Sequence, residues 1–367
     1  MVSTHTNTLS TASLCNPTKV NVYKKALSDI GCDSPYYAYE LLNRVGDINE
    51  ELQFFLFHNA SNDLIAIMPY LYRKILLNGE NTGYFDVISP WGYNGPFFKP
   101  TVSEKEIVCF WEVVDAWYKE NKVVSEFLRF NLQKDYRYYS GTELHTLYNV
   151  QGDITDWERF WSNLKPNTRN QFRKAEKLGL IFELHFENIE EKHIVAFHAL
   201  YISTMDRREA KDSFYLSLDY FLELWKNNPK QCAIGLVKQN GIAISTELFL
   251  MSSNTMYSFL GGTDANHFKL RPNEYLKINA IKWANEIGLT YYLIGGGLSN
   301  SIEDNLYLYK KKYFPLDEDV DFYTGRKIVM PNAYLELLKK AGYEHTDNTA
   351  LENIWEGYFP KYRNVKR

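Results

Sequence analysis

Three consecutive lysines near the C-terminal end of the chain, Lys310 to Lys312, lie between aromatic residues in the stretch Tyr-Lys-Lys-Lys-Tyr-Phe. A cation in such a place can hold a phosphate group or stabilise the negative charge that develops on a carbonyl oxygen during acyl transfer. A run of lysines can equally form a solvated basic face. Strand spacing would put Lys310 and Lys312 on one face, whereas helical spacing would separate them. We take Lys310 as the first catalytic candidate and Lys312 as a substrate-binding candidate.

Acyl transfer to an amine also needs a group that takes a proton from the nitrogen, and a carboxylate near the lysines would suit this role. Asp304, six residues before Lys310, is the preferred base. The alternative carboxylates are Glu303, Asp264 and Glu247. Water or the substrate itself can also serve. The phenol of Tyr257 is a candidate acid, although a place in the core is the commoner role for an aromatic residue of an apolar strand.

Neither a nucleophile of the enzyme nor a metal is expected. No Cys-His or Ser-His spacing suggests covalent catalysis. The eight histidines are dispersed, and no pair of them has the spacing of metal ligands. We therefore expect no covalent enzyme intermediate, no bound metal and no prosthetic group.

Two groups of glycines follow the strands that are predicted closest to these residues. Gly261 and Gly262 end an apolar strand at 257–262, and Gly295–Gly297 follow a second apolar strand at 291–294. A helix is predicted between the strands, at 272–287, and Gly288 suits its C-cap. Such a βαβ unit places a site at the strand C-termini, where glycine lets backbone approach a ligand. We take Gly261, Gly262, Gly295 and Gly296 as candidate contacts, with tight turns as the alternative.

Further cations occupy positions that suit a phosphate. Arg169 and Arg173 are four residues apart in a predicted basic helix at 166–179 and so share a face, which suits a phosphate, a carboxylate or an RNA backbone. A solvated face is the alternative. Lys269, Arg271 and Asn273 lie at the start of the helix at 272–287, where backbone amides also attract phosphate.

An aromatic passage punctuated by glycine and proline runs from 83 to 100 and contains Trp91 and Tyr93. Such a segment either fills a core or lines a pocket. Because pockets are common between domains, we take Trp91 and Tyr93 as candidates for lining an acceptor cleft.

The predicted elements divide the chain into a flexible tail at 1–18, an N-terminal domain at 19–152 and a C-terminal domain at 153–367. The first domain has a hairpin at 52–73, an amphipathic helix at 103–121 and a strand at 123–131. The second has the basic helix, a strand at 180–186, helices at 189–204 and 216–227, and a hairpin at 232–251 turning at Asn240-Gly241. The fold class is thus α/β (α+β), a doubled arrangement with mixed central sheets.

The composition is that of an ordinary folded protein with many aromatic residues. The 367 residues are 45% hydrophobic and 16% aromatic, which is enough for two domains. The net charge of -4 gives no general attraction for DNA or RNA, so an RNA contact would need a local basic patch. Four scattered cysteines indicate reduced thiols. With no signal peptide and no apolar segment of membrane-spanning length, we expect a cytoplasmic protein with at most peripheral membrane contact.

Several motifs resemble the FemAB-like acyltransferases, chiefly across residues 155–363. The helix Arg-Asn-Gln-Phe-Arg-Lys-Ala-Glu-Lys-Leu-Gly at 169–179 resembles their RN-x-x-RKAEK-x-G helix. The strand ending Leu-Gly-Gly-Thr at 260–263 resembles their GGT strand. Pro-Asn-Glu-Tyr-Leu at 272–276, the strand at 292–297, Tyr309-Lys310 and the closing Tyr-Phe-Pro-Lys-Tyr-Arg at 358–363 follow in the same order.

The resemblance implies two tandem GNAT-like subdomains that move an acyl or aminoacyl group from acyl-CoA or the end of a charged tRNA to an amine. The acceptor would be an amino sugar, a peptidoglycan precursor, another glycoconjugate or a small metabolite. It also implies that Lys310 lies at the donor or acceptor site. The sequence departs from CoA-binding relatives at 268–273, which replaces a glycine-rich pyrophosphate loop. The alternative function is a catalytically silent GNAT-like scaffold of envelope polysaccharide assembly.

Overall fold

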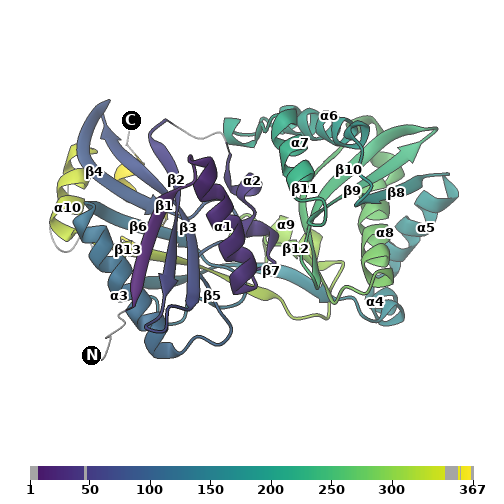
Figure 1. Cartoon of the computed structure of the whole chain (residues 1–367). Helices are drawn as coiled ribbons and strands as arrows, with labels where there is room; N and C mark the ends of the chain where they lie inside the picture. The colour runs from purple at the N-terminus through teal and green to yellow at the C-terminus, as the bar shows by residue number, and fades with distance from the viewer. Residues whose placement is uncertain (1–6, 45–47, 344–353, 356, 365–367) are drawn as a thin grey trace. The chain divides into compact units, whose positions relative to one another are not determined.

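The computed structural model describes residues 7–44, 48–343, 354–355 and 357–364, which form two compact units. Unit 1 combines Met1–Thr146 with Phe322–Arg367, and unit 2 is Leu147–Asp321. This division differs from the predicted boundary at 152/153, because the last part of the chain packs with the N-terminal part. Figure 1 labels the helices and strands of both units.

Unit 1 is built on a sheet with the strand order β1-β2-β3-β4-β6-β13, and β5 pairs with β3. Adjacent strands are antiparallel except β4 and β6, which are parallel. The bounds are β1 Thr8–Ser13, β2 Glu50–His58, β3 Leu64–Leu77, β4 Glu80–Ile88, β5 Phe97–Phe98, β6 Val123–Arg129 and β13 Val320–Ile328.

Two helices of unit 1, α1 and α3, begin at a side-chain cap. In α3 (Glu104–Glu120), Ser103 and Glu106 form a capping box, and the apolar face of the helix enters a core around Phe110 and Trp111. α1 (Pro17–Ile30) begins at a proline behind the Asn16 cap and ends at Gly31, whose φ of 76° suits glycine. The remaining helical segments are η1 Pro35–Tyr37, α2 Tyr39–Leu42, α10 Pro331–Lys340 and η5 Lys361–Arg363.

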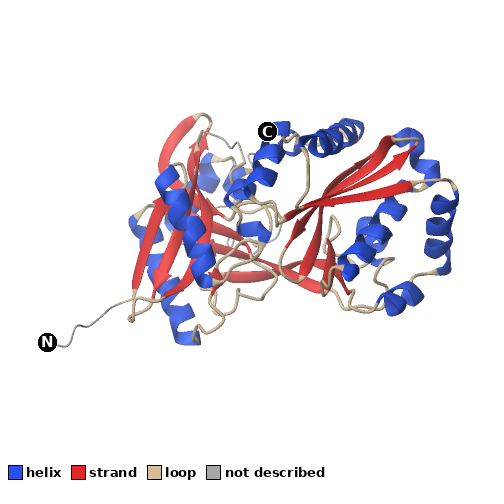
Figure 2. Ribbon diagram, turned by 45° about the vertical axis from the view of Figure 1, so that its right-hand side comes forward, coloured by secondary structure: helices blue, strands red, loops and turns tan. Residues whose placement is uncertain are grey.

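Unit 2 repeats this plan with the strand order β7-β12-β11-β10-β9-β8, again antiparallel except for one pair, β11 and β12. Its strands are β7 Thr142–Asp153, β8 Ile181–Phe186, β9 Cys232–Gln239, β10 Ile242–Met251, β11 Thr255–Thr263 and β12 Tyr291–Gly295. Its helices are α4 Trp157–Asn163, α5 Pro166–Lys177, α6 Glu191–Arg207, α7 Leu218–Asn227, α8 Pro272–Glu286 and α9 Asn305–Lys311, with short η2 Asp212–Phe214 and η3 Ala265–Leu270. Figure 2 shows the strands and helices by colour.

Helices α6 and α8 cover opposite faces of the unit 2 sheet. Gly262 faces α6, since a Cβ there would lie 2.2 Å from the carbonyl oxygen of Leu200. Glu247 points to the other face, where its side chain meets Lys277 of α8. The core between α8 and the sheet contains Leu276, Ile281 and Tyr292. The expected doubled α/β arrangement with mixed sheets is therefore confirmed.

Unit 1 takes one strand from the C-terminal part of the sequence, whereas unit 2 is built from one continuous segment. In unit 1, β6 is followed in the sheet by β13, which is encoded after all of unit 2. In unit 2, β12 pairs with β7, which directly follows the unit 1 strands in sequence. Both parallel pairs are joined by a helix, β4-α3-β6 and β11-α8-β12, as right-handed crossover geometry favours.

The expected flexible tail at 1–18 is wrong over its described part. Residues Thr8–Ser13 form β1, which pairs with β2 along its whole length, and Leu14 is buried. The segment is polar because β1 lies at the edge of the sheet, where side chains on one face remain in water. Residues 1–6 lie outside the described part of the chain.

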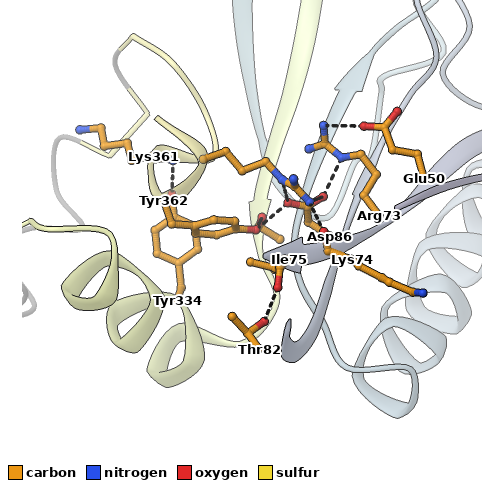
Figure 3. Close-up of polar contacts among 11 residues, drawn as sticks. Glu50, Arg73, Lys74, Ile75, Thr82, Asp86, Tyr334, Lys361 and Tyr362 are labelled. Atoms are coloured by element: carbon orange, nitrogen blue, oxygen red, sulfur yellow. Dashed lines mark hydrogen bonds and ion pairs between the residues drawn. The ribbon is translucent and has the colours of Figure 1, made fainter. Parts of the chain in front are cut away.

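Within unit 1, a buried carboxylate of β4 holds the C-terminal segment against the sheet. Asp86 of β4 is fully buried and accepts hydrogen bonds from Arg73 Nε at 2.8 Å, from Tyr362 Oη at 3.0 Å and from Arg363 Nε at 2.6 Å. Figure 3 shows these bonds converging on Asp86. Arg73 also approaches Glu50, at 3.6 Å. Since η5 contributes Tyr362 and Arg363, the network joins residues far apart in sequence.

We predict that Asp86→Ala destabilises the protein by about 3–5 kcal/mol, because it leaves two arginines in a buried site without their carboxylate. The free energy of unfolding in urea would measure the loss. Lys340→Ala, which removes an exposed pair with Glu336, is the control and should change stability little. Equal effects of the two variants would contradict the role assigned to Asp86.

Candidate functional site

The parallel strands β11 and β12 part at their C-terminal ends. They pair over Thr255–Tyr257 and Tyr291–Leu293 alone, although β11 continues to Thr263. The register of β11 on β10 slips at Phe259, which is an extra residue of the β-bulge type. Bulges bend a strand and often occur next to functional sites. β12 ends at Gly295, whose φ of 85° turns the chain in a way that glycine adopts easily.

The equivalent strands of unit 1 stay together. β4 and β6 pair from Phe85 to Ile88, and the amide of Ser89 still donates to the carbonyl of Phe127 at 2.9 Å. Among the described residues, the parting of a parallel pair therefore marks unit 2. We call the region between the C-terminal ends of β11 and β12 the opening; Gly261 borders it on one side and Gly295–Gly297 on the other.

Helix α9 carries Lys310 to the glycine side of the opening. The Lys310 ammonium donates to the carbonyl oxygen of Gly296 at 2.6 Å. Burial and, second, the nearby Lys277 cation lower the pKa of Lys310 to about 8, against the opposing effect of Glu247 and Asp304. The side chain is thus a partly desolvated cation whose proton is held weakly.

The other two lysines of the run have different partners. Lys311 donates to the carbonyl of Asp317 at 2.6 Å and to the carboxylate of Asp319 at 2.7 Å. Lys312 pairs with Glu274 at 3.1 Å and lies over the Tyr309 ring, 4.0 Å from its centroid. All three lysines are half-buried, so the run is not a solvated face. Helical geometry separates them, because α9 ends at Lys311 and Lys312 is its C-cap.

A polar cleft of about 520 Å³ lies between α5 and the turn that precedes α8. Its lining combines three cations with three amides: Lys174, Lys269, Arg271, Asn167, Asn170 and Gln171. Arg271 has a φ of 58° and is the N-cap residue of α8, so the first amides of that helix lie next to the cleft. Cations beside a helix N-terminus suit phosphate groups. Lys269 and Arg271 were predicted for this role, and the structure places them together.

Arg169 and Arg173 are not brought to this cleft. Arg169 donates to the carbonyl oxygens of Trp161 and Ser162, at 3.1 and 2.8 Å, and so satisfies the C-terminal end of α4. Arg173 lies over the Trp161 ring, 5.5 Å from its centroid. The predicted shared face is real but packs toward α4, and the neighbouring face with Asn170 and Lys174 lines the cleft. Phosphate binding by Arg169 and Arg173 is therefore corrected to a packing role.

Asp304 is engaged as a helix cap. Its Oδ1 accepts from the amides of Leu306 and Tyr307, at 2.9 and 3.0 Å, and its Oδ2 accepts from the amides of Leu298 and Ser299, both at 3.1 Å. The hydrogen bond from Tyr307, followed by those from the other donors, holds the pKa of Asp304 below its ordinary value. A carboxylate with both oxygens occupied and a lowered pKa is a poor base, so the geometry favours a capping role for Asp304 over the predicted role of base.

Tyr257 also points away from the cluster around Lys277. It pairs in register with Leu250, whereas Ser258 pairs with Phe249 and bonds to Lys277 on the face of α8. Because neighbouring residues of a strand alternate between faces, Tyr257 lies on the face of α6. Its assignment as a catalytic acid is therefore not supported by geometry.

The glycines divide into two kinds. A Cβ at Gly262 would meet the backbone of α6 at Leu200, so this glycine is required for packing rather than for a ligand. A Cβ at Gly297 would lie 2.5 Å from the Asp304 carboxylate. Gly296 supplies the carbonyl that Lys310 contacts, and Gly261 pairs with Glu247 in register. Asn273 donates to the Tyr309 hydroxyl at 3.0 Å, near Lys312.

Trp91 and Tyr93 belong to unit 1. The Tyr93 ring packs edge-on against Tyr36 and Phe322, and the Arg44 guanidinium lies 5.0 Å from the Trp91 ring centroid. The structure thus places Tyr93 in an aromatic group with Tyr36 and Phe322, and Trp91 beside Arg44. Their role in acceptor binding stays a prediction.

The sequence did not identify Lys277 and Ser258 as site residues. Glu247 was predicted as an alternative base, but the residue that binds it was not predicted. Lys277 lies in line with Ile281 and Ala284 on the buried face of α8, and Glu247 lies in the apolar strand β10. A charged residue inside an apolar stripe indicates a buried charge that needs an opposite one. That signal was present in the sequence, but it did not say which two charges meet.

Residues 162–311 match the family described as Acetyltransferase (GNAT) domain. Among solved structures, FemX has a TM-score of 0.59 at 12% identity over 85% of this chain and 97% of FemX. The C-terminal domain of a putative lysylphosphatidylglycerol synthetase from Agrobacterium fabrum has a TM-score of 0.56 at 12% identity, over 84% of this chain and 91% of that one. L-PGS from Bacillus licheniformis has a TM-score of 0.51 at 13% identity, over 85% of this chain and 92% of that one. Curated protein sequences gave no match.

The matched region contains the opening, the cleft and Lys310, and the fold is shared with FemX along most of both chains. Residues 162–311 thus match a GNAT-type acetyltransferase domain, and the chain as a whole, built from two units of similar plan, shares the fold of FemX. Among the described residues, no helix combines the length and apolar character needed to cross a bilayer. In the same part of the chain, no three His, Cys, Asp or Glu side chains are grouped to hold a metal.

We predict that Asp304→Asn lowers stability at neutral pH and that its difference from the wild type narrows in acid. A carboxylate whose pKa is lowered in the folded state stabilises the fold above its unfolded pKa, and this contribution is lost as pH falls through the folded value. Urea unfolding between pH 7 and pH 3 would follow the difference. Glu303→Gln, at the neighbouring exposed carboxylate, is the control and should show no such trend.

Proposed function

We propose that unit 2 transfers an acyl or aminoacyl group from a thioester or ester carrier to an amine, by direct attack and without a covalent enzyme intermediate. The observation that carries this proposal is the position of Lys310, whose ammonium lies at the carbonyl of Gly296 beside the parted strands. A carbonyl oxygen placed in the opening would meet a cation in partly dry surroundings. Such a cation stabilises the oxyanion of the tetrahedral intermediate far better than water does.

The cleft beside α8 supplies the means of holding the donor. Acyl-CoA and aminoacyl-tRNA both carry phosphates, and Lys174, Lys269 and Arg271 provide positive charge where the α8 amides begin. Both α8 and β11 lead from this region to the opening, so a donor anchored by phosphate would present its acyl end to Lys310. The cleft supports a phosphate-bearing donor without choosing between the two carriers.

Unit 1 is the natural place for acceptor recognition in this proposal. Its parallel strands remain paired, so it lacks the opening that unit 2 has among the described residues. Its aromatic side chains Trp91 and Tyr93 can stack on a sugar or a base of the acceptor. The fold shared with FemX and a putative lysylphosphatidylglycerol synthetase favours an amine of a cell-envelope precursor or amino sugar. We place the reaction in the cytoplasm, with at most peripheral contact with a membrane.

We predict that Lys310→Ala lowers kcat about 10²–10³-fold while the fold is kept, because it removes one oxyanion donor. Turnover would be measured with acyl-CoA and with aminoacyl-tRNA, and the fold by circular dichroism. Lys282→Ala, at an exposed lysine of α8, is the matched control and should keep full turnover. No turnover of the wild-type protein with any donor would favour the silent scaffold instead.

We predict that the double variant Lys269→Glu with Arg271→Glu binds the true donor at least tenfold more weakly and that its donor binding depends less on salt. Thermal shift with acetyl-CoA, a longer acyl-CoA and an aminoacyl-tRNA would identify that donor, since a ligand at 100 times its Kd stabilises the protein by about 2.7 kcal/mol. Lys192→Glu with Lys282→Glu, at exposed lysines of α6 and α8, is the charge-matched control. Equal weakening by both variants would show a general charge effect and no phosphate site.

A further inference from the structure

A buried ion pair lies on the α8 face of the sheet, next to the opening. The ammonium of Lys277 donates to both carboxylate oxygens of Glu247, at 2.6 and 2.7 Å, and to the hydroxyl oxygen of Ser258 at 2.8 Å. The Ser258 hydroxyl also donates to Glu247. Lys277 and Glu247 are 5% and 7% exposed. All three ammonium hydrogens of Lys277 thus have acceptors, and the cation is fixed in place.

The elements that hold these three residues also frame the site. Glu247 lies on β10, Ser258 on β11 one residue before the bulge, and Lys277 on α8. The Lys277 ammonium also lies 5.8 Å from the ring centroid of Tyr292 on β12. A buried ion pair contributes little to stability on balance, because desolvation of two charges offsets their attraction. Its presence beside the opening therefore calls for a functional explanation.

We propose that Glu247, Lys277 and Ser258 are positioning residues that set the protonation of Lys310, so that Lys310 first takes a proton from the acceptor's ammonium and then stabilises the oxyanion. This rests on the acyl transfer proposed above. It supplies the base that Asp304, with both oxygens occupied as a helix cap, does not provide.

The charged groups that act on Lys310 come from three directions. They are Lys277 from α8, Glu247 from β10 and Asp304 from the turn before α9. Both oxygens of Glu247 are bound by Lys277, so this carboxylate has little capacity left to hold a proton on Lys310. With burial added, the pKa of Lys310 is about 8, and roughly a tenth of these side chains are neutral at pH 7.

The proton balance of the reaction is complete with this assignment. The neutral Lys310 amine accepts one proton from the acceptor's ammonium, and the free amine forms the C–N bond to the acyl carbon. The resulting Lys310 ammonium donates to the oxyanion. As the bond to the carrier breaks, the leaving sulfur or oxygen takes the second proton from the attacking nitrogen, and Lys310 later returns its proton to water.

Chemical labelling of Lys310 tests the inference without a substrate. Acetic anhydride reacts with neutral amines, so the labelling rate of Lys310 between pH 6 and pH 11, measured by peptide mass spectrometry, reports its pKa. The exposed Lys282 serves as the internal reference. Lys277→Met should raise the pKa of Lys310 and slow labelling at pH 7 about fivefold or more. Glu247→Gln should lower the pKa and speed labelling.

The double variant Glu247→Gln with Lys277→Met leaves no buried unpaired charge and guards against misfolding of the single variants. In this double variant, the pKa of Lys310 should lie between its value in the wild type and its value in Lys277→Met, because the effect of Lys277 on that pKa exceeds the effect of Glu247. Identical titration of Lys310 in the wild type and the double variant, with Lys277→Met also unchanged, would overturn the inference.

An activity measurement separates this inference from the proposed function. If Lys310 acts as the base, the rising limb of kcat/KM against pH moves in each variant by the same amount as the labelling curve. A limb that stays fixed while labelling shifts would overturn the base role but leave acyl transfer intact. Absence of turnover in the wild type would instead overturn the proposed function.

Discussion

The site of this protein depends on the early end of hydrogen bonding between β11 and β12. Two parallel strands normally continue their ladder until one of them ends, as β4 and β6 do in unit 1. In unit 2 the ladder stops after Tyr257, with the bulge at Phe259 on one side and the turn at Gly295 on the other. Backbone that leaves a ladder must find other partners. Lys310 gives one such partner to the carbonyl of Gly296, and this brings a cation to the place where the sheet opens.

A buried lysine ammonium is costly in free energy, and the neighbouring charges determine how firmly Lys310 holds its proton. Burial favours loss of the Lys310 proton, and Lys277 acts in the same direction. Glu247 holds Lys277 with both oxygens, so the two charges largely satisfy one another. Lys311 and Lys312 each have a carboxylate of their own, Asp319 and Glu274. Lys310 instead donates to the carbonyl of Gly296, a neutral acceptor, so its charge remains available to a ligand.

Much of this could be predicted from the sequence, because apolar periodicity and glycine positions report directly on strands, helices and their ends. Such patterns predict the β11-α8-β12 unit and the place of Lys310 near its glycines. Lys269 and Arg271, predicted at the start of α8, line one cleft. What could not be predicted is which face of an element meets which neighbour. Arg169 and Arg173 share a helix face as expected, yet that face packs on α4. Asp304 is close to Lys310 in sequence, but its oxygens are bound by backbone amides that only the folded turn brings together.

The late position of β13 in the sequence also shapes how the molecule is made. The sheet of unit 1 needs β13, which begins at Val320, although its neighbour β6 has ended by Arg129. During synthesis from the N-terminus, the first unit must therefore wait with an unpaired strand until nearly the whole polypeptide has left the ribosome. An exposed strand edge invites pairing with other chains. A shortened gene ending before β13 would therefore encode an incomplete sheet rather than a smaller domain.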